Sequence, residues 1–190
     1  MALKFDPQGN MLATCGLDLL CRIWSEIDGY WMCTQEIELE KQPASLCWSP
    51  HVGSSNSGSL LLAIGSEEGT VSLFLISSLS AESAAFNGEA PVENLGPKQI
   101  NEIRCHSMHP VKHIAIHSSG TLMATGCSKS NGLINFWCLE QGLLVNTYTG
   151  PGGVSDICWI GENALAAGFT RSRVISLFLF RIEFSNNSIL

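Results

Sequence analysis

The chain has 190 residues, of which 45% are hydrophobic and 14% charged, so it can bury a core and does not have the composition of a disordered segment. It carries 10 Lys and Arg against 17 Asp and Glu, a net charge of −7. A chain with this balance lacks the positive field that a phosphate backbone requires, so we expect no nucleic-acid partner.

Four similar phrases follow one another along the chain. Each opens on a large hydrophobic residue, continues into a strand of small residues and closes on an aromatic residue. The openers are Phe5, Trp48, Ile116 and Trp159, with steps of 43, 68 and 43 residues. A period in the low forties predicts sheets that stack on their neighbours, because a single such sheet cannot bury both faces.

Short strands are expected within each phrase. The small-residue strands fall at 12–15, 60–65 and 122–126, and the closing strands at 21–24, 71–75, 133–137 and 174–178. Polar turns separate them, including Glu68-Gly69 and Asn131-Gly132, which suit tight hairpins. No stretch predicts a long helix, so the expected fold class is all-β.

The first phrase resembles the WD-repeat β-propellers. In that family the Asp of a tight turn, a Ser or Thr of the preceding strand, a Trp of the third strand and an upstream His form a buried, hydrogen-bonded set. The resemblance implies that Thr14, Asp18 and Trp24 lock the first blade. We then expect Asp18→Ala to leave Thr14 and Trp24 without a partner and to destabilise the fold.

The third phrase matches the same pattern less closely. His109 precedes its first strand, Thr125 and Trp137 are in place, and Asn131 stands where Asp is expected. The resemblance implies that these four residues lock the third blade. The second and fourth phrases depart further, closing on Phe74 and Phe178.

The repeats predict a partial propeller of about four four-stranded blades. Propellers of this family usually close with seven blades, so the resemblance implies a fragment, a splice form or the C-terminal part of a larger ring. The Ser, Ala, Glu and Asn content after the second phrase predicts an inserted loop, either mobile or partner-binding. The expected blades are 1–29, 30–77, 104–139 and 140–180, with the loop at 78–103 and a tail at 181–190.

Cysteine spacing and the absence of targeting signals predict an intracellular protein, cytoplasmic or nuclear. No two of the eight cysteines have the two-residue spacing of a zinc knuckle or a redox motif, so we expect reduced thiols within strands. There is no apolar leader and no stretch long enough to span a bilayer.

A histidine-rich segment offers an alternative of a different class. Cys105, His106, His109, His113 and His117 fall within thirteen residues, and a strand would place His113 and His117 on one face. These histidines could serve a metal-binding or enzymatic propeller. The resemblance gives His109 a structural role, and we therefore expect the chain to hold no metal and no cofactor.

The expected function is a non-catalytic interaction scaffold. The sequence contains no glycine-rich phosphate loop, nucleophile elbow or His-Glu-x-x-His helix, so we expect no enzyme. The resemblance implies protein partners in a larger complex and no small-molecule substrate. An alternative is the substrate-recognition component of a ubiquitin ligase. The third phrase is similar to the destruction-motif-reading propellers of the anaphase-promoting complex in its turn at 126–132, Phe136-Trp137 and Thr149-Gly150.

Overall fold

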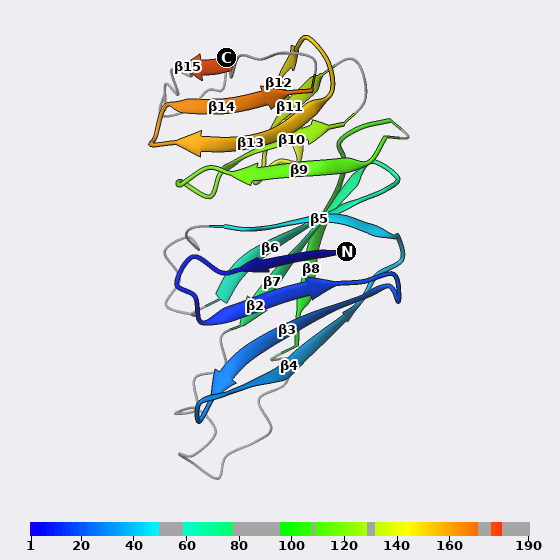
Figure 1. Cartoon of the computed structure of the whole chain (residues 1–190), viewed down its shortest axis with the longest axis vertical. Coiled ribbons are helices and arrows are strands. Elements are labelled where there is room, and N and C mark those ends of the chain that lie inside the picture. The colour runs from blue at the N-terminus through cyan, green and yellow to red at the C-terminus, as the bar shows by residue number, and fades with distance from the viewer. Residues whose placement is uncertain (50–58, 78–95, 108, 129–131, 171–175, 180–190) are drawn as a thin grey trace.

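The computed structural model describes residues 1–49, 59–77, 96–107, 109–128, 132–170 and 176–179 (Figure 1). Within these ranges every regular element is a β-strand, which confirms the all-β fold class. In the described part of the chain, no helix has the length and apolar character needed to cross a membrane.

The strands form consecutive antiparallel sheets in which each strand pairs with the next along the chain. The first sheet comprises β1 (Ala2–Phe5), β2 (Met11–Cys15), β3 (Leu20–Ile27) and β4 (Tyr30–Glu38). The second comprises β5 (Pro43–Trp48), β6 (Ser59–Ser66), β7 (Thr70–Ser77) and β8 (Lys98–Arg104). The third comprises β9 (Val111–Ile116), β10 (Leu122–Cys127), β11 (Leu133–Cys138) and β12 (Leu143–Thr149). The fourth comprises β13 (Val154–Ile160), β14 (Ala164–Phe169) and β15 (Ser176–Leu179).

The outer strands shift the blade boundaries from those predicted. β4 completes the first sheet, although the sequence predicts residues 30–38 in the second blade, and β12 completes the third sheet. β8 completes the second sheet although it falls in the predicted loop at 78–103. These strands are mostly solvent-exposed, so they lack the apolar pattern that predicts a strand. Residues 78–95 and the tail at 181–190 lie outside the described residues.

Opener and closer lie in one cross-strand row in every sheet. In the first sheet Phe5 pairs with Leu12, which pairs with Trp24. Directly paired residues point to the same face, so each row gathers large apolar side chains on one side of its sheet. The other rows are Trp48–Leu62–Phe74 and Ile116–Met123–Trp137, and in the fourth sheet Trp159 pairs with Leu165, whose backbone pairs with that of Phe178.

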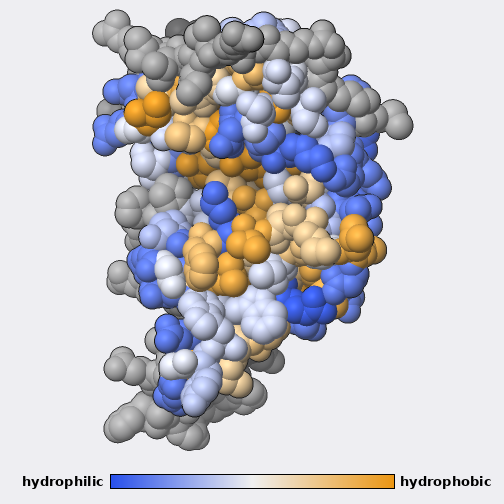
Figure 2. All heavy atoms as spheres, viewed as in Figure 1, coloured by the Kyte–Doolittle hydropathy of each residue, from blue (hydrophilic) through white to orange (hydrophobic). Residues whose placement is uncertain are grey.

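The four sheets are stacked in chain order, and the innermost strands β1, β5, β9 and β13 lie beside one another (Figure 1). Three hydrophobic clusters fill the three interfaces, each combining residues of two neighbouring sheets. Figure 2 shows hydrophobic residues gathered over the middle of this view, with hydrophilic residues towards its edges. The repeats therefore stabilise one another by mutual burial.

Two of the openers also carry a hydrogen bond between sheets. The Trp48 Nε1–H donates to the Lys4 carbonyl oxygen at 2.9 Å, and the Trp159 Nε1–H donates to the Ala115 carbonyl oxygen at 3.1 Å. Both bonds reach from the first strand of one sheet to the first strand of the preceding sheet. The indole thus buries apolar surface and satisfies its donor in the same contact.

Candidate functional site

The first predicted lock is present only in part. The Trp24 Nε1–H donates to Thr14 Oγ1 at 2.9 Å, across the paired strands β2 and β3. Asp18 does not join these two residues: its carboxylate accepts from Arg22 Nη1 at 2.7 Å and from the Leu20 backbone N–H at 3.4 Å. The physical reason is that Arg22 lies opposite Thr14, within reach of the turn, and holds the carboxylate at the surface. The hydrogen bond from Arg22 also lowers the pKa of Asp18 below its ordinary value.

We expect Asp18→Ala to leave the melting temperature nearly unchanged, in contrast to the sequence-based expectation. Its ion pair with Arg22 is solvent-exposed, and such pairs contribute little to stability. Thermal unfolding of Asp18→Ala beside the wild-type chain measures the effect. A loss as large as that caused by Thr14→Val would show that Asp18 belongs to the buried lock after all.

The third repeat contains a hydrogen-bonded series of three buried side chains. The Trp137 Nε1–H donates to Thr125 Oγ1 at 3.0 Å, and His106 Nε2 lies 3.0 Å from the same oxygen. His106 is 2% exposed, Thr125 0% and Trp137 7%. Thr125 and Trp137 are thus brought together as the sequence predicts. Asn131 lies outside the described residues.

The histidine that reaches Thr125 is His106, three residues before the predicted His109. His109 lies half-buried in the connection between β8 and β9. The physical reason lies in the preceding turn, since the Gly69 carbonyl accepts both the Cys105 and the His106 backbone N–H groups. That anchor buries the second residue after β8. The sequence alone does not indicate which of the two histidines contacts Thr125.

We expect Thr125→Val to cost about 2–4 kcal/mol in the free energy of unfolding, because it leaves His106 and Trp137 buried without their partner. Thr14→Val is the matched control. This substitution removes the hydrogen-bond partner of the half-buried Trp24 alone, so we expect a loss of about 1 kcal/mol in the free energy of unfolding. Urea unfolding of both variants gives the comparison. Equal losses of unfolding free energy in the two variants would contradict the larger contribution to stability that we assign to the hydrogen-bonded series of the third repeat.

Stability should also depend on pH through His106. Burial lowers the pKa of His106 to about 4, from an ordinary value of 6.5. As the pH falls from about 6.5 towards 4, the unfolded chain takes up a proton that the folded chain excludes, so the free energy of unfolding decreases. Above pH 6.5 both states are neutral at this residue and the effect vanishes.

Unfolding at several pH values tests this dependence. In His106→Gln we expect the slope between pH 6.5 and 5 to be shallower by up to about 1.4 kcal/mol per pH unit. His113, whose pKa burial also lowers, accounts for part of the slope that remains. Identical slopes in variant and wild type would refute the assignment to His106.

The histidine-rich segment does not converge on one point. His117 accepts from the Ser119 backbone N–H through Nδ1 and lies 2.8 Å from the Glu162 carbonyl through Nε2, joining the third sheet to the fourth. His113 Nδ1 lies 3.7 Å from Asp156, and His106 contacts Thr125. Among the described residues, no three His, Cys, Asp or Glu side chains are grouped to hold a metal ion. The described geometry gives the metal-binding alternative no support.

Most cysteines lie within the sheets, as predicted. Five are buried, and burial raises the pKa of the Cys105 thiol to about 12. Cys15 and Cys21 lie directly opposite each other in β2 and β3, and their mutual hydrogen bond raises the pKa of the Cys21 thiol above its ordinary value. Cys33 and Cys158 are exposed, so these two thiols lie at the surface.

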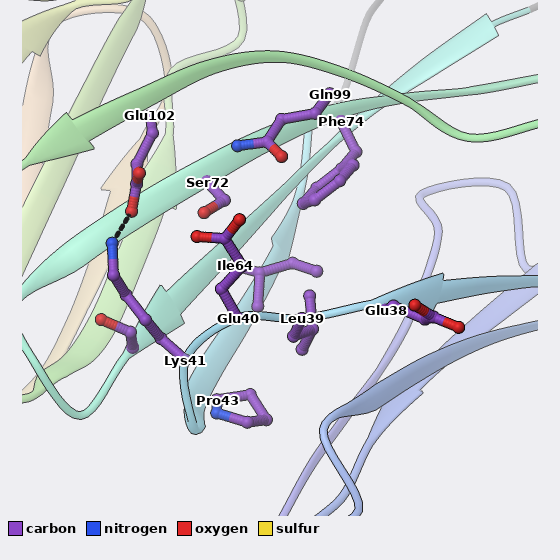
Figure 3. Close-up of a pocket in the computed structure, with 11 residues that line it drawn as sticks. Glu38, Leu39, Glu40, Lys41, Pro43, Ile64, Ser72, Phe74, Gln99 and Glu102 are labelled. Carbon is purple, nitrogen blue, oxygen red and sulfur yellow. Dashed lines mark hydrogen bonds and ion pairs between the residues drawn. The ribbon is translucent and has the colours of Figure 1, made fainter.

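A small groove lies between the first and second sheets. It has a volume of about 90 Å³, and the segment after β4 forms one wall while β6, β7 and β8 form the other (Figure 3). Leu39, Pro43, Ile64 and Phe74 supply apolar lining, and the Glu40 carboxylate points towards the middle of the view.

The groove carries an excess of negative charge. Glu38, Glu40 and Glu102 line it against the single ammonium of Lys41. The Lys41–Glu102 ion pair, which lowers the pKa of Glu102, engages one of the three carboxylates. The hollow is far smaller than the pockets of roughly 300 Å³ and more that enclose metabolites. Its size and charge suit one cationic side chain with an aliphatic stem.

Consecutive antiparallel sheets, three with four strands and a fourth with three strands among the described residues, are stacked through their apolar rows and define a protein built from propeller blades. Residues 1–25 and 97–138 match the family model described as WD domain, G-beta repeat. The chain therefore contains WD repeats. The second match runs from just before β8 to the end of β11 and includes His106, Thr125 and Trp137.

Proposed function

We propose that this chain is a non-catalytic protein–protein interaction scaffold and works as a subunit of a multi-protein assembly. WD-repeat domains generally act as interaction scaffolds. The groove between the first and second sheets carries the proposal, because it combines apolar lining with acidic groups and is too small to enclose a metabolite.

The arrangement of the polar side chains supports the same function. His106 and Trp137 each form a hydrogen bond with Thr125, and His117 forms one with the neighbouring sheet. Their donors and acceptors thus stabilise the blades, as in a buried polar network. The ubiquitin-ligase interpretation stays a prediction, because residues 129–131 of the turn behind it lie outside the described residues.

Affinity purification followed by mass spectrometry tests the scaffold function. We expect the chain to retain stable protein partners, and Glu40→Arg to lose at least one of them through charge reversal in the groove. Glu140→Arg is the control, since it makes the same charge change on the exposed turn between β11 and β12. Absence of stable partners, together with turnover of a small molecule, would refute the scaffold function. Equal partner sets in both variants would exclude the groove as the contact.

A further inference from the structure

Two carboxylates of the groove between the first and second sheets differ in what they bind. Glu102 on β8 is paired with the Lys41 ammonium. The Glu40 carboxylate points into the groove, towards the wall that carries Ser72 and Gln99 (Figure 3). Within the described part of the chain, no cation and no hydrogen-bond donor is paired with Glu40. The groove therefore contains one carboxylate that is neutralised and one that is open to a cation from outside.

The wall opposite Glu40 supplies uncharged acceptors. The Ser72 hydroxyl on β7 and the Gln99 side-chain amide on β8 both line the groove. Neither side chain forms a hydrogen bond with any other residue that the structure describes. A ligand whose N–H groups are spread over a plane can thus donate to the carboxylate on one wall and to these oxygens on the other.

The apolar lining and the size of the groove restrict the ligand further. Leu39, Pro43, Ile64 and Phe74 suit an aliphatic stem, and a volume of about 90 Å³ admits one side chain rather than a metabolite. Arginine combines such a stem with five N–H donors in a planar fork. The lysine ammonium is a compact, strongly hydrated charge, so it reaches acceptors on one wall only at a higher cost in desolvation.

We propose that this groove binds an arginine side chain of a partner protein. The guanidinium donates to the Glu40 carboxylate, while its stem packs on Leu39 and Ile64. The net charge of −7 favours the approach of such a basic segment. Lys41 limits the affinity, because its ammonium repels the guanidinium and occupies Glu102. This inference rests on the scaffold function proposed above and names the residue of the partner that is recognised.

Titration of the full chain with the peptide acetyl-Gly-Arg-Gly amide, followed through the backbone amide NMR signals, tests the groove alone. We expect a dissociation constant on the order of 1 mM, with the largest shifts at residues 38–41 and 99–102. The lysine peptide should bind at least about threefold more weakly. The citrulline peptide, which has nearly the same shape without the charge, should bind at least about tenfold more weakly.

Two variants with opposite expected effects sharpen the test. Glu40→Gln should weaken binding of the arginine peptide about fivefold or more, because it removes the open carboxylate. Lys41→Gln should strengthen binding about threefold, because it removes the repulsion and frees Glu102. Glu140→Gln makes the same change as Glu40→Gln on the exposed turn between β11 and β12, and it should bind like the wild type. Signals away from the groove should coincide in all variants.

The outcomes separate this inference from the scaffold function. Equal binding of the arginine and citrulline peptides, or equal weakening in Glu40→Gln and Glu140→Gln, overturns the arginine site. Weaker binding in Lys41→Gln overturns it too, since Lys41 would then support the ligand. A chain that retains protein partners but does not bind the peptide keeps the scaffold function and loses only this site. Peptide binding by a chain that retains no partners contradicts the scaffold function instead.

Discussion

Gly69→Ala is expected to destabilise the chain by about 4 kcal/mol or more, an exceptional loss for one methyl group. Gly69 has a φ of 91°, which side-chain-bearing residues rarely adopt. A Cβ there would overlap the His106 carbonyl oxygen and lie 3.0 Å from that of His109. These are backbone atoms, and the Gly69 carbonyl holds their segment in place through the Cys105 and His106 N–H groups. The clash can be relieved only by displacing the segment after β8, which places the His106 side chain in contact with Thr125.

Gly9→Ala is the matched control for this prediction. Gly9 has a similar φ of 78°, but nothing lies within 4 Å of the position that an alanine methyl group would take. We expect only the cost of a left-handed alanine, about 1–2 kcal/mol. Urea unfolding of both variants isolates the contribution of the close approach. Losses of similar size would mean that the turn at Gly69 is not packed against the connection from β8 to β9.

The repeat itself could be predicted from the sequence, because the spacing of large and small residues reflects which side chains meet across strands. The four openers, the small-residue strands and the closers fall in register in the structure. Apolar rows must be buried, so their periodicity is visible in the residues alone. The WD-repeat resemblance rests on these same positions, and the family match to residues 1–25 and 97–138 confirms it.

The outer strands could not be recognised in the same way. β8 and β12 face solvent on most of their residues, so hydrophobic periodicity carries no signal for them. Their pairing is determined by backbone hydrogen bonds to β7 and β11. The predicted blade boundaries are therefore displaced by one strand in the first three sheets.

The polar locks were only partly predictable, because a few residues of chain decide which side chain reaches the interior. Asp18 matches the family pattern in position, yet Arg22 binds it at the surface. His106 lies in the interior because Gly69 anchors the segment after β8. The bonds from Trp48 and Trp159 to the preceding sheet depend on the stacking of sheets far apart in sequence.

Leu62→Ala carries the second large expected effect. Leu62 lies at the centre of its row, is 0% exposed and packs with residues of both the first and second sheets. Truncation would leave a cavity between two blades, so we expect a loss of about 3 kcal/mol. Leu12 occupies the same place in the row of the first sheet, but on the face that points away from the second sheet, and it is only half-buried. We expect Leu12→Ala to cost about 1 kcal/mol.

The difference between these two variants tests the stacking of the sheets most directly. Urea unfolding at a concentration where the chain is monomeric compares the same substitution at equivalent positions of two repeats. Stacked blades predict that Leu62→Ala costs about 2 kcal/mol more than Leu12→Ala. Equal losses would contradict the burial of one row by the neighbouring sheet, and with it the claim that these repeats stabilise one another.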